Sequence, residues 1–253
     1  MSNSLYVAWR AGTAEHGYWG PVGRLDFLDG VFRFGYTQGA NTLPGFLPFA
    51  GMGDFEEVYE SDILFPLFAN RLLAPSRPEY EAYLTWSGFD HLSPPDPLAI
   101  LGVTEGRRMT DAVEIFPCPK PKDGRYSCIF FLHGVRHLLP TALEHVAALQ
   151  SGAVLNLLPE PTNDKDPHAV GVYSATVDGL RIGYVPRFLA RDAGLLLNLL
   201  PADELTLTVR KINLNAPLQQ RLLCHLSAPW PADFAPCSGA EFQMITLPVA
   251  EPA

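Results

Sequence analysis

Apolar and polar residues alternate in the first part of the chain in the pattern of β-strands. Apolar side chains recur at every second position over 5–9, which is the period of a strand with one buried face. A second run over 22–28 meets a third over 31–36 through Asp29 and Gly30. Asp-Gly between two alternating runs predicts a tight hairpin, because both turn residues adopt positive φ angles.

Between this hairpin and a further strand predicted over 112–116, the apolar spacing becomes helical. Ser76 and Glu79 have the spacing of a capping box ahead of an apolar run. Asp96 followed by proline is typical of an N-cap and first helical position, and Gly102 predicts the end of that helix. The three helices predicted here are short: one within 61–73, one from Ser76 to Gly88, and one between Asp96 and Gly102.

A pattern of many short strands follows residue 126. The strands are predicted over 128–132, 154–158, 169–174, 181–185 and 205–212, and helices over about 141–150 and 187–200. Asp178-Gly179 predicts a turn between two of these strands. We also expect Cys224 and His225 to lie on a helix. Short strands with two helices are typical of a small barrel with helical decoration.

The segment PCPKPKDGRY, residues 117–126, is rich in proline and lysine and predicts a joint between two domains. The expected organisation has four parts: an acidic domain over 1–118, a linker over 119–126, a barrel over 127–212 and a C-terminal extension over 213–253. The fold class is therefore α+β, a small β-barrel with helices preceded by a mixed sheet-and-helix subdomain.

Composition places the chain among globular proteins. It has 253 residues, of which 47% are apolar and 18% are charged. No apolar run approaches the ~18 residues that a membrane span requires, and the opening residues predict no export signal. Four cysteines without a CxxC pair indicate a reducing compartment, so we expect a cytoplasmic protein without a disulfide or zinc knuckle.

Charge is unevenly distributed along the chain, whose net charge is −9. Residues 1–118 contain 7 Arg, no Lys and 15 acidic residues, whereas residues 119–226 contain 11 basic and 9 acidic residues. All four lysines fall in the second segment. This asymmetry predicts two parts with different partners, and only the second is suited to a polyanion.

Three motifs in the second half are similar to those of the HIRAN domain, found in Rad5-type helicases and in bacterial stand-alone forms. They are GVRHL at 134–138, LPEPTNDKDPHAVGVY at 158–173 and RIGYVPRFLA at 181–190. The resemblance covers about 127–212. It implies a small OB- or SH3-like β-barrel that binds single-stranded DNA, with a preference for a free 3′ end.

A barrel groove binds single strands with a few cations on phosphates and flat groups under bases. The cations here are Arg136, Lys165, Arg181, Arg187 and Arg191, and the flat polar rings are His137, His168 and Tyr184. The resemblance implies that Arg136 contacts phosphate and base. It also implies that Asn163 and Asp166 contact the terminal nucleotide, with the Asp166 carboxylate accepting a hydrogen bond from the 3′-hydroxyl.

The sequence departs from the family pattern at three places. His137-Leu138 replaces an aromatic pair, Lys165 stands where an aromatic residue often lies, and His168 replaces an Asn. Tyr184 stands where the helicase-like form has a His. Base stacking on an aromatic ring contributes ~1–3 kcal/mol, so these changes lower the expected affinity.

Structural roles compete with binding roles at the same residues. Asn163 and Asp166, beside prolines, are also suited to Asx turns. Arg136 is also suited to an ion pair, and Tyr184 to the edge of the core.

The first part of the chain resembles, more loosely, the small N-terminal subdomain of HipA-type toxin kinases. The similarity covers about 5–117 and rests on LYVAW, PVGRLDFLDGVFRFGY, the FANRLL helix, PDPLAILG and VEIFP. The kinase core is absent, so phosphoryl transfer is not implied. An acidic module without lysine suits docking to another protein, and a solvated acidic face without a partner is the alternative.

Enzyme signatures are scarce. No G-x-S-x-G motif frames a nucleophile. His133, His137 and His145 lack a carboxylate at metal-ligand spacing, and the D-x-D of Asp164 and Asp166 lacks acids on a second element. We therefore predict no catalytic residue, metal or cofactor.

The leading hypothesis is a non-catalytic protein that binds single-stranded DNA or DNA 3′ ends and contacts an unknown protein, in DNA repair or a defence or toxin–antitoxin system. The alternatives are a purely protein-interacting component that has lost DNA binding, and a small metal-dependent hydrolase.

Overall fold

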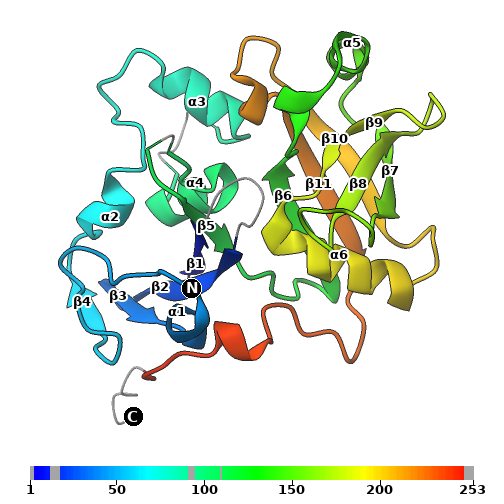
Figure 1. The fold of residues 1–253 in the computed structure, drawn as a ribbon. Coiled ribbons are helices and arrows are strands. Elements are labelled where there is room, and N and C mark those ends of the chain that lie inside the picture. The colour runs from blue at the N-terminus through cyan, green and yellow to red at the C-terminus, as the bar shows by residue number, and fades with distance from the viewer. Residues whose placement is uncertain (1–2, 12–17, 91–94, 109, 248–253) are drawn as a thin grey trace. The chain divides into compact units, whose positions relative to one another are not determined.

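The computed structural model describes residues 3–11, 18–90, 95–108 and 110–247. The chain forms two compact units (Figure 1). The first unit comprises residues 1–75, 95–118 and 235–253, and the second comprises 76–94 and 119–234. Each unit contains an antiparallel sheet with short helices, so the fold mixes α and β structure as predicted.

Five strands among the described residues form the sheet of the first unit, in the order β4-β3-β2-β1-β5. They are β1 (Asn3–Ala11), β2 (Tyr18–Leu28), β3 (Val31–Tyr36), β4 (Tyr59–Ser61) and β5 (Val113–Pro117). The predicted hairpin is confirmed: Asp29 and Gly30 have φ angles of 52° and 85° and join β2 to β3. The predicted strand near 112–116 is confirmed as β5, which pairs with β1.

Short helices accompany this sheet: α1 (Gln38–Thr42), α2 (Pro66–Ala69), α4 (Pro97–Thr104) and η3 (Ala240–Phe242). The predicted cap of α4 is confirmed, since the Asp96 carboxylate accepts a hydrogen bond from Leu98 N at 2.9 Å. The predicted stop at Gly102 is wrong. Gly102 is buried within α4, and the helix ends at Thr104, followed by the C-cap residue Glu105 in the left-handed conformation.

The second unit contains six described strands in the order β6-β11-β10-β7-β8-β9. They are β6 (Arg125–Phe131), β7 (Val154–Pro159), β8 (Val170–Ser174), β9 (Arg181–Tyr184), β10 (Thr206–Ile212) and β11 (Leu222–Pro229). Reciprocal backbone hydrogen bonds of 3.0 and 2.9 Å join His133, just beyond β6, to Tyr184 at the end of β9. The sheet therefore curls until its two edge strands meet, which fits the expected small barrel.

The helices of the second unit are α3 (Tyr80–Trp86), η1 (Val135–His137), α5 (Pro140–Ala148), α6 (Arg187–Leu199) and η2 (Leu218–Gln220). α6 lies along one end of the curled sheet (Figure 1). It buries Phe188, Ala193 and Leu196, whose spacing places them on one face of the helix. The capping box predicted for α3 is wrong, because the residue before the helix is Glu79 and no side chain caps it.

The two units differ from the predicted domain limits at both ends of the barrel. Residues 76–94 belong to the second unit, where the Lys211 ammonium donates to Thr85 O at 2.6 Å and the Asn213 amide donates to Trp86 O at 3.0 Å. The predicted extension 213–253 is divided. Its first part supplies β11, between β6 and β10, and residues 235–247 belong to the first unit.

The helix expected at Cys224 and His225 is also wrong, because both lie on β11. Successive residues of a strand point to opposite faces. Cys224 is fully buried, and the His225 ring lies 2.8 Å from the Ser127 hydroxyl oxygen on the outer face. Among the described residues, no helix has the length and apolar character needed to cross a membrane.

Candidate functional site

A single carboxylate connects the second and third sequence motifs. Glu160 follows β7, and its Oε1 accepts hydrogen bonds from the Tyr173 hydroxyl at 2.8 Å and from Arg181 at 3.3 Å. Its Oε2 accepts from the Tyr184 hydroxyl at 3.0 Å and from the Asn163 amide at 3.2 Å. We call these five side chains the Glu160 cluster. They come from β8, β9 and the loop that joins β7 to β8.

Strand register brings the cluster together. Gly171 on β8 lies opposite Leu158 on β7 and opposite Tyr184 on β9. A Cβ atom on Gly171 would lie 2.5 Å from Glu160 Oε1 and 2.8 Å from the Tyr173 ring. The glycine therefore leaves the space that the carboxylate and the phenol ring occupy.

The cluster also determines the protonation of its members. Burial by itself raises the pKa of Glu160, but hydrogen bonds from Tyr173, Asn163 and Tyr184 and the charge of Arg181 together lower it below its ordinary value. Burial and the neighbouring carboxylate raise the pKa of both tyrosines. At neutral pH the cluster is thus an anionic acceptor surrounded by protonated donors.

Tyr184 is enclosed by two other motif residues. The Arg181 guanidinium carbon lies 4.9 Å from the centre of the Tyr184 ring, in a cation–π arrangement. Gly134 has a φ angle of 78°, and a Cβ atom there would lie 3.0 Å from a carbon of the same ring. The His133–Tyr184 backbone bridge and this close approach bring the first motif to the third.

The loop between β7 and β8 contains the Asx turns expected as the structural alternative. Asn163 Oδ1 accepts from the backbone N–H groups of Lys165 at 3.0 Å and Asp166 at 3.3 Å. Asp166 Oδ1 accepts from His168 N at 2.9 Å, and its Oδ2 lies 3.4 Å from Arg187 Nε. Since a carboxylate accepts about four hydrogen bonds, the turn leaves acceptor capacity for a ligand.

Arg136 and His137 lie on η1, and both side chains are exposed. Arg136 Nε donates to His137 Nε2 at 2.9 Å, so among the described residues Arg136 forms no ion pair of the kind considered as its structural role. The side chains of Lys165 and His168 are also exposed. Asn163 and Tyr184 both donate to Glu160, the Asn163 side chain accepts from Asp166 N, and Asp166 faces Arg187. The segment that contains η1 is connected to these residues through the backbone bridge between His133 and Tyr184.

Sequence reasoning missed Glu160 and Tyr173. Both lie inside the second motif, but apart from Asn163 the partners of Glu160 are 13 to 24 residues away. One signal was present: an acidic residue at the end of a strand within a segment rich in cations and flat rings.

Other chemistry is sparse in the described part of the chain. No three His, Cys, Asp or Glu side chains there come together so as to hold a metal ion. Burial raises the pKa of the Cys224 thiol far above its usual range, which opposes thiolate formation. Desolvation and the charges of Arg210 and Arg125 lower the pKa of His225, so the Ser127–His225 pair has a neutral imidazole at pH 7.

Comparison with known proteins identifies part of the second unit. Residues 126–230 match the family model of the HIRAN domain. This match includes β11, which lies beyond the predicted limit of residue 212.

Two solved structures are similar to this chain. One is the HIRAN domain of human HLTF, with 17% identity and a TM-score of 0.31 over 43% of this chain and 81% of that chain. The other is a protein from Lactobacillus plantarum, with 19% identity and a TM-score of 0.30 over 42% of this chain and 97% of that chain. No curated protein matches this chain.

Proposed function

We propose that the HIRAN domain at residues 126–230 binds single-stranded DNA and recognises its 3′ end. The observation that carries the proposal is the meeting of the three motifs in the second unit. Glu160 joins the second motif to the third, and Gly134 of the first motif lies against the Tyr184 ring of the third. Motifs separated by up to about fifty residues in sequence thereby share one region.

In this proposal the exposed cations Arg136 and Lys165 contact phosphates. Arg181, stacked on Tyr184, presents a guanidinium plane for a base, which partly replaces the missing aromatic residues. Asp166 accepts a hydrogen bond from the 3′-hydroxyl, and Arg187 beside it orients the carboxylate. The role of Glu160 is positioning, because its carboxylate is already surrounded by four donors.

The remaining assignments are also proposals. Residues 1–118 are acidic and contain no lysine, which suits contact with another protein. The HipA-like interpretation of this region depends on its sequence motifs alone. We propose a non-catalytic, cytoplasmic role in DNA repair or in a defence or toxin–antitoxin system.

The decisive experiment measures binding of the full chain to a labelled single-stranded oligonucleotide by fluorescence anisotropy. One oligonucleotide ends in a 3′-hydroxyl, a second in a 3′-deoxy residue, and a third is circular. We expect tighter binding to the free 3′-hydroxyl, and affinity that falls steeply with salt because phosphate contacts release counterions. Equal affinity for all three ligands would contradict the proposed recognition of the 3′ end. Absence of binding even at low salt would favour the alternative of a purely protein-interacting component.

A further inference from the structure

The curled sheet of the second unit is incomplete between β7 and β10. β7 pairs with β10 only at Val154–Thr208 and Leu155–Leu207. On its other edge, β7 pairs with β8 as far as Pro159–Val170. Residues 156–159 of β7 therefore present an edge that is unpaired on the β10 side.

The antiparallel pattern identifies the backbone groups at this edge. Ala153 O accepts from Val209 N at 2.8 Å, and in an antiparallel pair every second residue points its N–H and C=O toward the same neighbour. The residues that point toward β10 are thus Ala153, Leu155 and Leu157. No backbone hydrogen bond joins Leu157 to another strand on this side within the described part of the chain. One donor and one acceptor at the centre of the edge are left for a partner.

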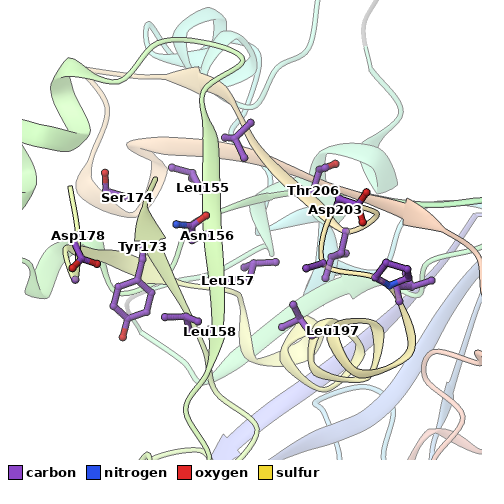
Figure 2. A pocket seen from close by; sticks show the side chains of 16 residues that line it. Leu155, Asn156, Leu157, Leu158, Tyr173, Ser174, Asp178, Leu197, Asp203 and Thr206 are labelled. Carbon is purple, nitrogen blue, oxygen red and sulfur yellow. The ribbon is translucent and has the colours of Figure 1, made fainter. Parts of the chain in front are cut away.

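An open groove of about 650 Å³ lies beside this edge. Its walls are β7, the end of β8 with the turn that follows it, the end of α6 and the turn from α6 to β10. Figure 2 shows Leu157 and Leu197 on the same side of β7. Val154 and Leu158 are 54% and 51% exposed at its border. An unpaired strand edge beside exposed aliphatic side chains is a template for an added strand.

The charge of the groove selects its occupant. Its lining contains Asp178 and Asp203 and, among the described residues, no Lys, Arg or His. Figure 2 shows these two carboxylates on opposite sides of β7. An acidic, leucine-rich groove disfavours a nucleic-acid backbone and favours a ligand with cations. Tyr173, a member of the Glu160 cluster, also borders this groove.

We propose that this groove binds an extended segment of a partner protein, which adds a strand to the free edge of β7. Main-chain hydrogen bonds to Leu157 hold the segment, its alternate apolar side chains pack on the side of β7 that bears Leu197, and Leu158 borders the segment on the other side. Lys or Arg residues of the segment pair with Asp178 and Asp203. This site is on the second unit and is independent of the proposed DNA binding.

The test uses the full chain without nucleic acid. A random seven-residue peptide library is selected on it, and the peptides that it enriches are synthesised and labelled. We expect enriched peptides with alternate apolar residues and at least one Lys or Arg. Bound peptide is expected to slow amide hydrogen exchange of Leu157 at least tenfold. Methylation of the peptide N–H groups that face β7 should weaken binding at least tenfold, whereas methylation of the intervening N–H groups should not.

Lysine substitutions inside and outside the groove are compared for their effect on peptide binding. Asp203→Lys and Leu158→Lys should each weaken peptide binding at least fivefold, while Glu144→Lys, an exposed change on α5, should leave it unchanged. Absence of an enriched pattern, or equal binding by all three variants, would overturn the proposal. The proposal would also be overturned if an oligonucleotide displaced the peptide and bound the Leu158→Lys variant more weakly than the parent, because the groove would then bind nucleic acid. A dimer that Leu158→Lys dissociates would identify a second copy as the occupant and also overturn it.

Discussion

At the scale of single residues, the loop carboxylates have two roles that need not exclude each other. Asp166 closes an Asx turn with one oxygen and faces Arg187 with the other, and both oxygens keep acceptor capacity. Asp166 is therefore suited both to forming the turn and to accepting a hydrogen bond from a ligand. Only a substitution that keeps the turn and removes the charge distinguishes these two roles.

Asp166→Asn makes that separation, because the Asn side-chain oxygen still accepts from His168 N. We expect the variant to fold as the parent does and to lose about tenfold or more of its preference for a free 3′-hydroxyl, since a hydrogen bond to a charged acceptor contributes ~1.5–3 kcal/mol. Binding to a circular strand should change little. Asp164→Asn, in the same loop, is the control. Retention of the 3′ preference by Asp166→Asn would contradict the assigned role.

A second carboxylate is notable for its isolation. Asp192 on α6 is buried, and its Oδ2 has no hydrogen-bond partner within the described residues. Burial raises the pKa of Asp192 to about 7, against a small opposing effect of the Arg191 charge. Below about pH 4 the group is protonated in both folded and unfolded chains, so it does not disfavour folding there.

As pH rises from about 4 to 7, the unfolded chain loses this proton first, and the stability that it contributes is lost. Asp192→Asn should therefore raise the free energy of unfolding at pH 8, by up to about 4 kcal/mol for a pKa difference of this size, and change it little at pH 4. Thermal melting at the two pH values measures this. A variant that is less stable than the parent at pH 8 would show that the carboxylate has a partner.

At the scale of elements, β8 determines whether the Glu160 cluster can form. Gly171 is buried and its φ angle is not positive, so the backbone itself tolerates another residue. The space beside it is filled by the Glu160 carboxylate and the Tyr173 ring. The Glu160 cluster thus fits beside β8 because Gly171 has no side chain.

Gly171→Ala should displace that carboxylate and ring while leaving the sheet paired. We expect a cost of about 1–3 kcal/mol in stability and at least fivefold weaker oligonucleotide binding. Gly194→Ala on α6 is the control, because a Cβ atom there meets nothing within 4 Å, and it should stabilise the chain by up to about 1 kcal/mol. Denaturant unfolding and anisotropy measure the two effects. Unchanged binding by Gly171→Ala would separate the cluster from the site.

At the scale of the whole molecule, each compact unit is assembled from segments that are not contiguous in the sequence. Residues 76–94 precede the proline-rich joint but belong to the second unit, and their carbonyl groups accept from Lys211 and Asn213. A cut at the joint therefore does not isolate the HIRAN-like unit.

A chain that begins at residue 119 should melt at a lower temperature than the corresponding transition of the full chain. It loses the two acceptors on α3 and leaves the buried side chain of Asn213 without one of its partners, at a cost of about 1–3 kcal/mol for each unsatisfied group. Circular dichroism melting measures this, with Asn213→Ala in the full chain as a comparison. Equal melting of the truncated and full chains would show that α3 is dispensable.

The sequence by itself determined most strands, the Asp-Gly hairpin of the first unit, and the three motifs of the second unit, where a family model also matches over 126–230. These signals are local, because a turn needs particular φ angles and a strand needs a period of two residues. The helix wrongly expected at Cys224 shows the limit of such signals. On β11 the residues from Cys224 to Ala228 do alternate between buried and outer positions, but a run this short cannot be distinguished from a helix by its periodicity alone.

Only the tertiary structure decided the partners of Glu160, the placement of α3 and the position of β11 between β6 and β10. Each depends on which strands pair and in which register, over separations of 13 to more than 120 residues. The free edge of β7 has the same origin. β10 begins at Thr206 and therefore does not extend far enough to pair with Leu157. The sequence of β7 gives no indication of where the neighbouring strand begins.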